Sequence, residues 1–121
     1  MNRVIKQKGT GELVLARARW CASYWCRAKG LMFRSRLDAD EGLLFVLGRA
    51  SKANASIHMF FVFLPLGVVW IDNDLRVVDA KLAKPWRPAY APAKAAKYFV
   101  EARPDILDRV AVGDVLVFEE A

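Results

Sequence analysis

The chain has 121 residues, enough for one domain, and 55% of them are hydrophobic, enough for a packed core without a disulfide or a metal. This composition excludes a disordered protein. The N-terminal segment lacks the apolar stretch of a signal peptide, and the apolar run 59–71 is too short for a membrane helix. We therefore expect a soluble, cytoplasmic protein with no membrane span, in which the run 59–71 forms a buried pair of strands.

Positive charge is concentrated in the first third of the chain and negative charge in its last residues. Residues 1–36 carry nine Lys or Arg against Glu12, residues 101–121 carry six Asp or Glu against two Arg, and the formal net charge is +6. A basic protein often binds an acidic partner such as nucleic acid. Here the basic residues stand singly between apolar ones, as on the solvated side of ordinary elements, so we do not expect nucleic acid to be the partner.

The first half of the chain predicts a strand, a helix and a second strand. Residues 12–19 alternate so that two arginines share one face, which indicates a strand. Residues 20–29 fit a short helix that ends at Gly30, because glycine readily takes the left-handed cap conformation. An acidic turn then precedes a compact apolar strand over 42–47, and the small and polar residues 48–56 predict a loop.

The second half begins with the clearest hairpin, in which 66–72 and 75–82 flank an Asp-Asn-Asp turn. The proline-rich segment 83–94 predicts an extended surface loop. We expect, in order, a strand over 96–102, a short helix beginning near Pro104, a turn at Gly113–Asp114 and a final strand. Residues 1–121 are thus predicted to form a single mainly β (α+β) domain, a small antiparallel sandwich or partly open barrel of five to seven strands with two short helices.

The two cysteines, Cys21 and Cys26, lie five residues apart in "WCASYWC". On one helix this spacing places them about 140° apart around the axis, which suits neither a local disulfide nor a shared metal. A zinc site would also need ligands that one histidine and two cysteines cannot supply. We expect two free thiols, buried or half-buried, that behave as small hydrophobic side chains.

The order of several motifs is similar to that of a known family. The segments "RAKGLMFRSRL", "EGLLFVL", "IHMFFVFLPLGVVWID", "LRVVDAKLAKPWR", "AKYFVEA" and "VGDVLVF" resemble, in that order, the family catalogued as domain of unknown function number 192. The match covers residues 12–119 and looks closest to the branch that reads Ile-His-Thr-Phe-Phe-Met-Arg-Phe-Pro-Ile-Asp and then Pro-Trp-Arg. The resemblance implies a compact, mostly β domain of bacterial or archaeal type with no established activity.

This chain departs from that branch at two positions. Phe63 stands where the branch has Arg, and Gly67 stands where it has Asp, so both replacements delete a charge. If the family's site depends on those two groups, this member has lost them. The residues of the pattern that remain, and that we take as candidate ligand-binding residues, are His58, Arg34, Trp86 and Arg87.

His58, the only histidine, has two interpretations. In the structural one, its ring buries one face and a nitrogen bonds a backbone carbonyl of the loop 48–55. In the functional one, it converges with Arg34 and Arg87 on a small anionic ligand, because Arg offers a planar fork for carboxylate or phosphate, and Trp86 adds a flat apolar wall.

Each arginine also has a structural alternative. Arg34 would neutralise Asp38 or Asp40, or cap the first helix, and Arg87 would stack on Trp86 or Tyr90.

The expected function is a non-catalytic binding or accessory module with a small polar or anionic ligand site near His58, and with no cofactor or metal. One alternative is a hydrolase that uses His58 as its base, although no nucleophile elbow, carboxylate pair or phosphate loop occurs. Another is a weak nucleic-acid binder that uses the basic N-terminal third. A protein partner that contacts Trp86 and Tyr90 is a further expectation.

Overall fold

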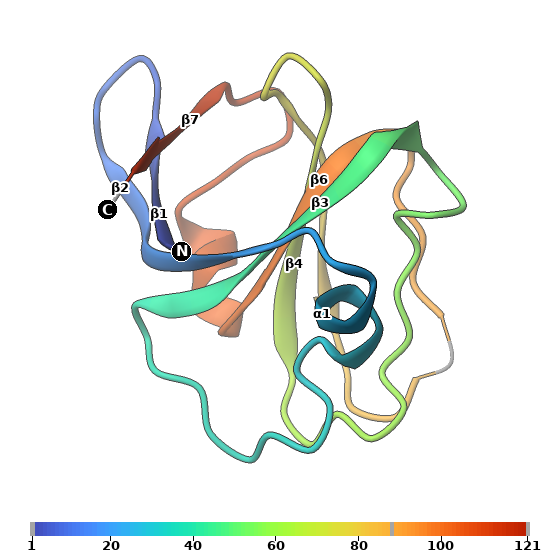
Figure 1. Cartoon of the computed structure of the whole chain (residues 1–121). Coiled ribbons are helices and arrows are strands. Elements are labelled where there is room, and N and C mark those ends of the chain that lie inside the picture. Colours follow the sequence, from blue (N-terminus) through green and yellow to red (C-terminus); the bar gives the residue numbers. More distant parts are fainter. Residues whose placement is uncertain (1, 88, 121) are drawn as a thin grey trace.

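The computed structural model describes residues 2–87 and 89–120. Its seven strands form one mixed sheet in the order β5-β4-β6-β3-β2-β1-β7, which curls into the partly open barrel expected from the sequence (Figure 1). The elements are β1 (Asn2–Gln7), β2 (Leu13–Cys21), α1 (Tyr24–Lys29), β3 (Glu41–Ser51), β4 (Leu66–Ile71), β5 (Val77–Ala83), β6 (Ala96–Ala102), the 3-10 turn η1 (Pro104–Asp108) and β7 (Leu116–Glu120). None of the described helices is long and apolar enough to cross a bilayer.

Pairing within the sheet is antiparallel with one exception, the parallel pair β2 and β3. The purely antiparallel arrangement expected from the sequence is therefore wrong at this point. The chain leaves the end of β2, passes through α1 and returns to the start of β3, and such a crossover is what a parallel pair requires. Strand β1, which the sequence did not predict, pairs with both β2 and β7.

Two predicted elements have other boundaries. Trp20 and Cys21 belong to β2, so the helix begins at Tyr24, where Ser23 accepts a hydrogen bond from the Cys26 N–H and acts as the N-cap. The apolar run 59–71 does not form two strands. Only its second half is β4. The first half is irregular chain in which Met59 exchanges backbone hydrogen bonds with Trp86 and Arg87 of the proline-rich loop, and the Phe61 carbonyl accepts from the Phe33 N–H.

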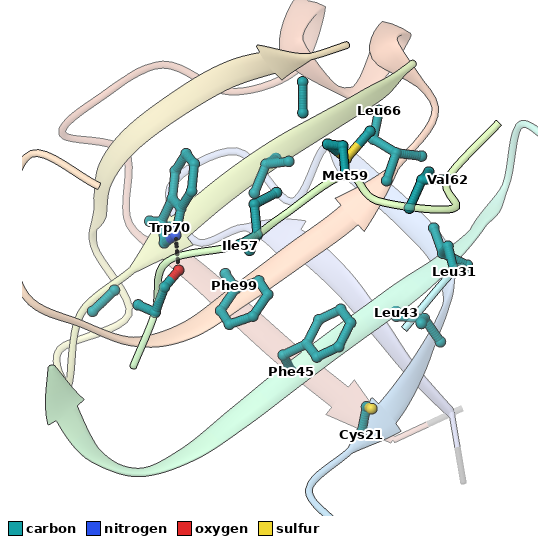
Figure 2. Close-up of a cluster of buried hydrophobic side chains, with 14 of the residues drawn as sticks. Cys21, Leu31, Leu43, Phe45, Ile57, Met59, Val62, Leu66, Trp70 and Phe99 are labelled. Carbon is teal, nitrogen blue, oxygen red and sulfur yellow. Dashed lines mark hydrogen bonds between the residues drawn. The ribbon is translucent and has the colours of Figure 1, made fainter. Parts of the chain in front are cut away.

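Side chains of the central strands β3, β4 and β6 alternate between two apolar layers. One layer, which we call the cavity face, contains Phe45, Trp70 and Phe99, and the rings of Phe45 and Phe99 stack with their centroids 4.5 Å apart (Figure 2). The irregular chain 55–62 covers this layer, and the buried indole N–H of Trp70 donates to the Ala55 carbonyl at 2.7 Å. That bond holds the covering segment against the sheet.

The opposite layer, which we call the sealed face, is packed against β1, β2 and η1. Two glycines allow this close packing. A Cβ on Gly42 would lie 2.6 Å from the Glu101 backbone oxygen, and a Cβ on Gly67 would lie 2.6 Å from Ile106 Cγ2. Gly67, one of the two departures from the resembling family branch, is therefore the residue that lets η1 rest directly on β4.

Candidate functional site

A cavity of about 400 Å³ lies on the cavity face, between α1 and the sheet. The stacked pair Phe45 and Phe99 forms its apolar floor, and the chain 54–58 forms one side. Its polar lining comes from three separate parts of the chain: α1 and its C-terminal end, the segment that covers the sheet, and β6. These polar side chains are Arg27, Lys29, Asn54, Ser56, His58 and Glu101.

Glu101 is the buried acid of this cavity. Its residue surface is only 7% exposed. Within residues 2–87 and 89–120, no side chain or backbone group hydrogen-bonds or ion-pairs with its carboxyl group, which opens to the cavity. Desolvation by burial raises the pKa of this carboxyl from its ordinary 4.5 to about 8. The cavity therefore contains a carboxylic acid that keeps its proton at neutral pH.

Strand register explains why the neighbours of Glu101 are apolar. Glu101 pairs with Leu43 on β3 and with Val68 on β4, and all three side chains lie on the cavity face. Above them, a Cβ on Gly30 would lie 3.5 Å from the Phe45 ring and 3.6 Å from Glu101 Oε1. Gly30 has a φ of 50°, so it both ends α1, as the sequence predicted, and comes close to the carboxyl group.

His58 lies at the rim of the same cavity. It is exposed, whereas the structural interpretation from the sequence placed one face of the ring against the core. Its Nδ1 accepts a hydrogen bond from the Phe60 N–H at 3.2 Å, and its ring lies 5.5 Å from that of Phe60. This assignment leaves the proton on Nε2, which is a donor available to a ligand.

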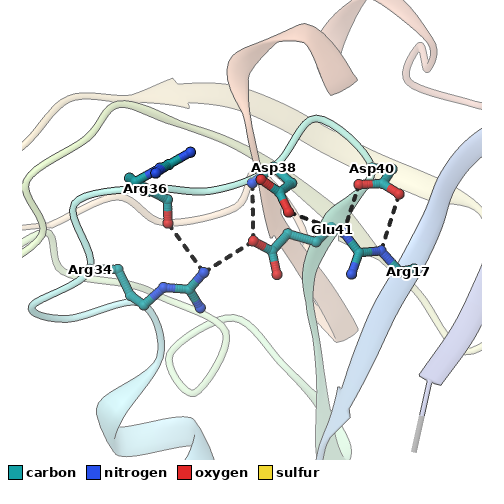
Figure 3. Close-up of polar contacts among 6 residues, drawn as sticks. All are labelled: Arg17, Arg34, Arg36, Asp38, Asp40 and Glu41. Atoms are coloured by element: carbon teal, nitrogen blue, oxygen red, sulfur yellow. Dashed lines mark hydrogen bonds and ion pairs between the residues drawn. The ribbon is translucent and has the colours of Figure 1, made fainter.

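Arg34 lies in another hollow, beside β2 and β3. Its Nη2 contacts Glu41 Oε1 at 3.1 Å and the Arg36 carbonyl at 3.1 Å (Figure 3). The proposed partners Asp38 and Asp40 bind Arg17 instead, at 3.3 Å and 2.8 Å. The pKa of Asp40 is lowered, first by its hydrogen bond with Arg17, and the pKa of Arg17 is raised by the same bond.

Trp86 and Arg87 are fixed by their backbone. The Trp86 N–H donates to the Met59 carbonyl at 2.8 Å, and the Met59 N–H donates to the Arg87 carbonyl at 2.9 Å. Trp86 is 49% exposed, and its indole contacts two phenylalanine rings, those of Phe61 and Phe63. Of the four residues predicted from the sequence, His58 thus lines the cavity beneath α1, Arg34 lies in another hollow, and Trp86 and Arg87 are not among the described residues that line either one.

Cys21 and Cys26 form a disulfide, so the expectation of two free thiols is wrong. That expectation placed both residues on one helix. Cys21 instead ends β2 and Cys26 lies on α1, and the turn between them brings the two Cα atoms to 5.5 Å, within the range that a disulfide spans. The bond ties α1 to the sheet at the edge of the cavity.

Glu101 is the site residue that was not predicted from the sequence. Its signal is an acidic residue two positions after Phe99 in the strand "AKYFVEA", where alternation places both on the same face. An acid on the apolar face of a central strand is uncommon and asks for an explanation. Among the described residues, no group of three or more His, Cys, Asp or Glu is placed to hold a metal ion.

Comparisons with known proteins identify the family. The chain matches "DUF192: Uncharacterized ACR, COG1430" over residues 4–118. A UPF0127 protein of Thermococcus kodakarensis is 48% identical over 75 residues, which are 62% of this chain and 46% of that protein. A UPF0127 protein of Pyrococcus furiosus is 35% identical over 108 residues, which are 88% of this chain and 90% of that protein. This chain therefore spans about half the length of some curated relatives and most of others.

A solved structure agrees with this result at the level of the fold. A protein of unknown function from Novosphingobium aromaticivorans superposes with a TM-score of 0.83 at 24% identity, over 94% of this chain and 83% of that one. The family match covers almost the whole sequence, and the Pyrococcus furiosus relative is similar along most of its own length. The chain belongs to the uncharacterised DUF192 (UPF0127) family.

Proposed function

We propose that this protein is a non-catalytic binding module whose cavity beneath α1 takes a small organic anion with an apolar body. The observation that carries the proposal is Glu101, a residue only 7% exposed whose carboxyl group opens to the cavity and that no other described residue hydrogen-bonds. A buried polar group without a partner is costly, and a ligand that supplies the partner recovers that cost.

The sign of the ligand's charge follows from the protonation state of Glu101. With its pKa near 8, the group is mostly protonated at neutral pH and donates an O–H to an oxyanion. Arg27 and Lys29 on α1 and the Nε2–H of His58 add positive charge and a donor at the rim. The stacked rings of Phe45 and Phe99 offer an apolar wall for the body of the ligand.

A hydrolase that uses Ser56 and His58 has weaker support. The Ser56 hydroxyl donates to the Lys52 carbonyl at 3.1 Å, and His58 Nδ1 accepts from the Phe60 backbone. The imidazole nitrogen able to act as a base is therefore already hydrogen-bonded, and the hydroxyl is directed toward its own loop.

Binding of simple probes tests the proposal. Benzoate, acetate, benzyl alcohol and benzylamine are titrated into the protein, and amide shifts are followed by NMR at several pH values. We expect benzoate to perturb residues of the cavity, acetate to bind more weakly for lack of an apolar body, and the affinity for benzoate to fall as pH rises through about 8.

Two substitutions of one residue separate its roles. Glu101→Gln keeps a hydrogen-bond donor and should bind benzoate without the pH dependence. Glu101→Leu removes the donor and should lower the affinity at neutral pH by about tenfold or more. Tighter binding of benzylamine with rising pH, or no perturbation of cavity residues by any probe, would contradict the proposal, provided that circular dichroism shows both variants to be folded.

A further inference from the structure

Four exposed aromatic residues form a closed ring at one end of the molecule. Phe33, Phe61, Trp86 and Phe63 contact each other in that order, with centroid distances of 5.2, 5.1, 6.0 and 6.4 Å around the ring. Each residue is between 44 and 63% exposed. We call this group the aromatic tip. An exposed cluster of large rings marks an interaction surface, because a globular protein rarely exposes several of them side by side.

The aromatic tip is built from three segments far apart in the sequence. They are the connections between α1 and β3, between β3 and β4, and between β5 and β6, which gather at the lower end of the view in Figure 1. The Phe33 N–H donates to the Phe61 carbonyl at 2.8 Å, and the Trp86 N–H donates to the Met59 carbonyl at 2.8 Å. The rings are therefore presented by loops that the backbone holds together.

The backbone at the aromatic tip is unusual. Phe33, Phe61 and Trp86 have φ values of 65°, 60° and 66°, a left-handed conformation that bulky residues seldom adopt. Each costs on the order of 1 kcal/mol or more and persists only where the surroundings enforce it. Three such residues, each at least 44% exposed, are therefore held in this conformation at one surface of the molecule.

The charge around the aromatic tip is positive. Within residues 31–36, 58–66 and 84–87 the Lys, Arg, Asp and Glu residues are Arg34, Arg36, Lys84 and Arg87, and the two acidic residues further along the α1–β3 connection, Asp38 and Asp40, pair with Arg17. These four cations are exposed, and Glu41, which lies outside these segments, pairs with Arg34. The complementary partner is therefore anionic and has an apolar layer that aromatic rings can enter.

We propose that the aromatic tip docks this protein onto the interface of an anionic lipid bilayer. Aromatic side chains prefer the headgroup region, and basic residues beside them gain from anionic lipids. Base stacking on nucleic acid fits less well, because each ring of the tip already packs against two others, whereas stacking platforms present free ring faces. This inference is independent of the ligand cavity and of Glu101.

Cosedimentation with vesicles tests the inference. The full chain is mixed with phosphatidylcholine vesicles that contain or lack phosphatidylglycerol. We expect binding to the anionic vesicles that weakens with added salt, together with a blue shift of tryptophan fluorescence that Trp86→Phe removes. Phe61→Ser/Phe63→Ser should lower the vesicle affinity by at least about tenfold, and Arg36→Glu by about fivefold.

Matched variants at the far end of the molecule provide the controls. Leu13→Ser/Val112→Ser removes two exposed apolar side chains, one at the start of β2 and one in the connection from η1 to β7, and Lys8→Glu reverses an exposed cation in the connection from β1 to β2. Figure 1 shows both connections away from the three that build the aromatic tip. Both variants should bind vesicles as the unmodified protein does. Four outcomes would overturn the inference. The protein does not bind anionic vesicles, or the tip and control variants lose vesicle affinity equally. Alternatively, the same rings bind single-stranded DNA, or the protein is a dimer in solution that Phe61→Ser/Phe63→Ser dissociates.

Discussion

The two faces of the central strands are made from the same three segments and yet differ in kind. On the sealed face, Leu44 and Val100 pack with other fully apolar side chains, and Gly42 and Gly67 let neighbouring elements approach to contact. On the cavity face, Glu101 lies beside a cavity whose rim carries cations. The difference indicates that one side of each strand maintains the fold, while the other side is free to carry a buried acid.

The strongest test of the sealed face is Gly67→Asp, which places at this position the residue expected from the family resemblance. We expect a loss of about 5 kcal/mol or more in unfolding free energy, because the new Cβ meets Ile106 at 2.6 Å and the carboxylate enters an apolar layer. Urea denaturation followed by circular dichroism measures the loss.

Gly48→Asp is the matched control. Gly48 lies on β3 of the same sheet, near the end of the strand, and nothing lies within 4 Å of a Cβ placed there. It should change the unfolding free energy by no more than about 0.5 kcal/mol. Equal stability of the two variants would mean that η1 moves away readily and that this face is not sealed.

The next largest effect concerns the pH dependence that Glu101 gives to stability. In the unfolded chain its carboxyl ionises near the ordinary pKa of 4.5, and in the folded protein near 8. Between these pH values the folded state binds more protons than the unfolded state, so the unfolding free energy falls as pH rises. The destabilisation is absent below about pH 4.5 and complete above about pH 8.

Glu101→Gln should remove this slope and raise the unfolding free energy at pH 9 by about 3 to 4 kcal/mol. This gain is smaller than the full pKa shift of Glu101 implies, because a buried site relaxes when it ionises. Urea denaturation at a series of pH values measures it. Glu120→Gln, which alters an exposed carboxyl group on β7, should leave the slope unchanged. A slope that persists in Glu101→Gln would show that the acid is not the group responsible.

Parts of the fold that depend on neighbouring residues could be predicted from the sequence. The β4–β5 hairpin was predicted from its Asp-Asn-Asp motif, which is typical of a local turn. In the structure, Asp72 Oδ1 accepts hydrogen bonds from the Asp74 and Arg76 N–H groups. Strand β1 was missed because its basic composition does not resemble a core strand, and only its distant partners β2 and β7 make it one.

The candidate site was predicted only in part, for a similar reason. A lone histidine in an apolar run attracts notice, and His58 does line the cavity. The cavity itself depends on where α1 lies, and that position depends on a disulfide between β2 and α1, whereas the helix predicted over 20–29 contained both cysteines. Without the correct boundary between β2 and α1, the position of α1 is unknown, and the sequence does not reveal that Glu101 lines a cavity.

The smallest expected effect concerns this disulfide, which belongs to the cavity face alone. Cys21→Ser/Cys26→Ser opens a short loop, so the chain-entropy argument gives a loss of about 2 kcal/mol in unfolding free energy. Hydrogen exchange should become faster in α1 and unchanged in β1 and β7, since α1 has no buried residue of its own to hold it. Ser23→Ala, which removes the N-cap but keeps the disulfide, serves as the control and should cost about 1 kcal/mol. If the double variant instead increased hydrogen exchange on the sealed face as much as Gly67→Asp does, the two layers would unfold as one cooperative unit. The distinction between a sealed face and a cavity face would then be wrong.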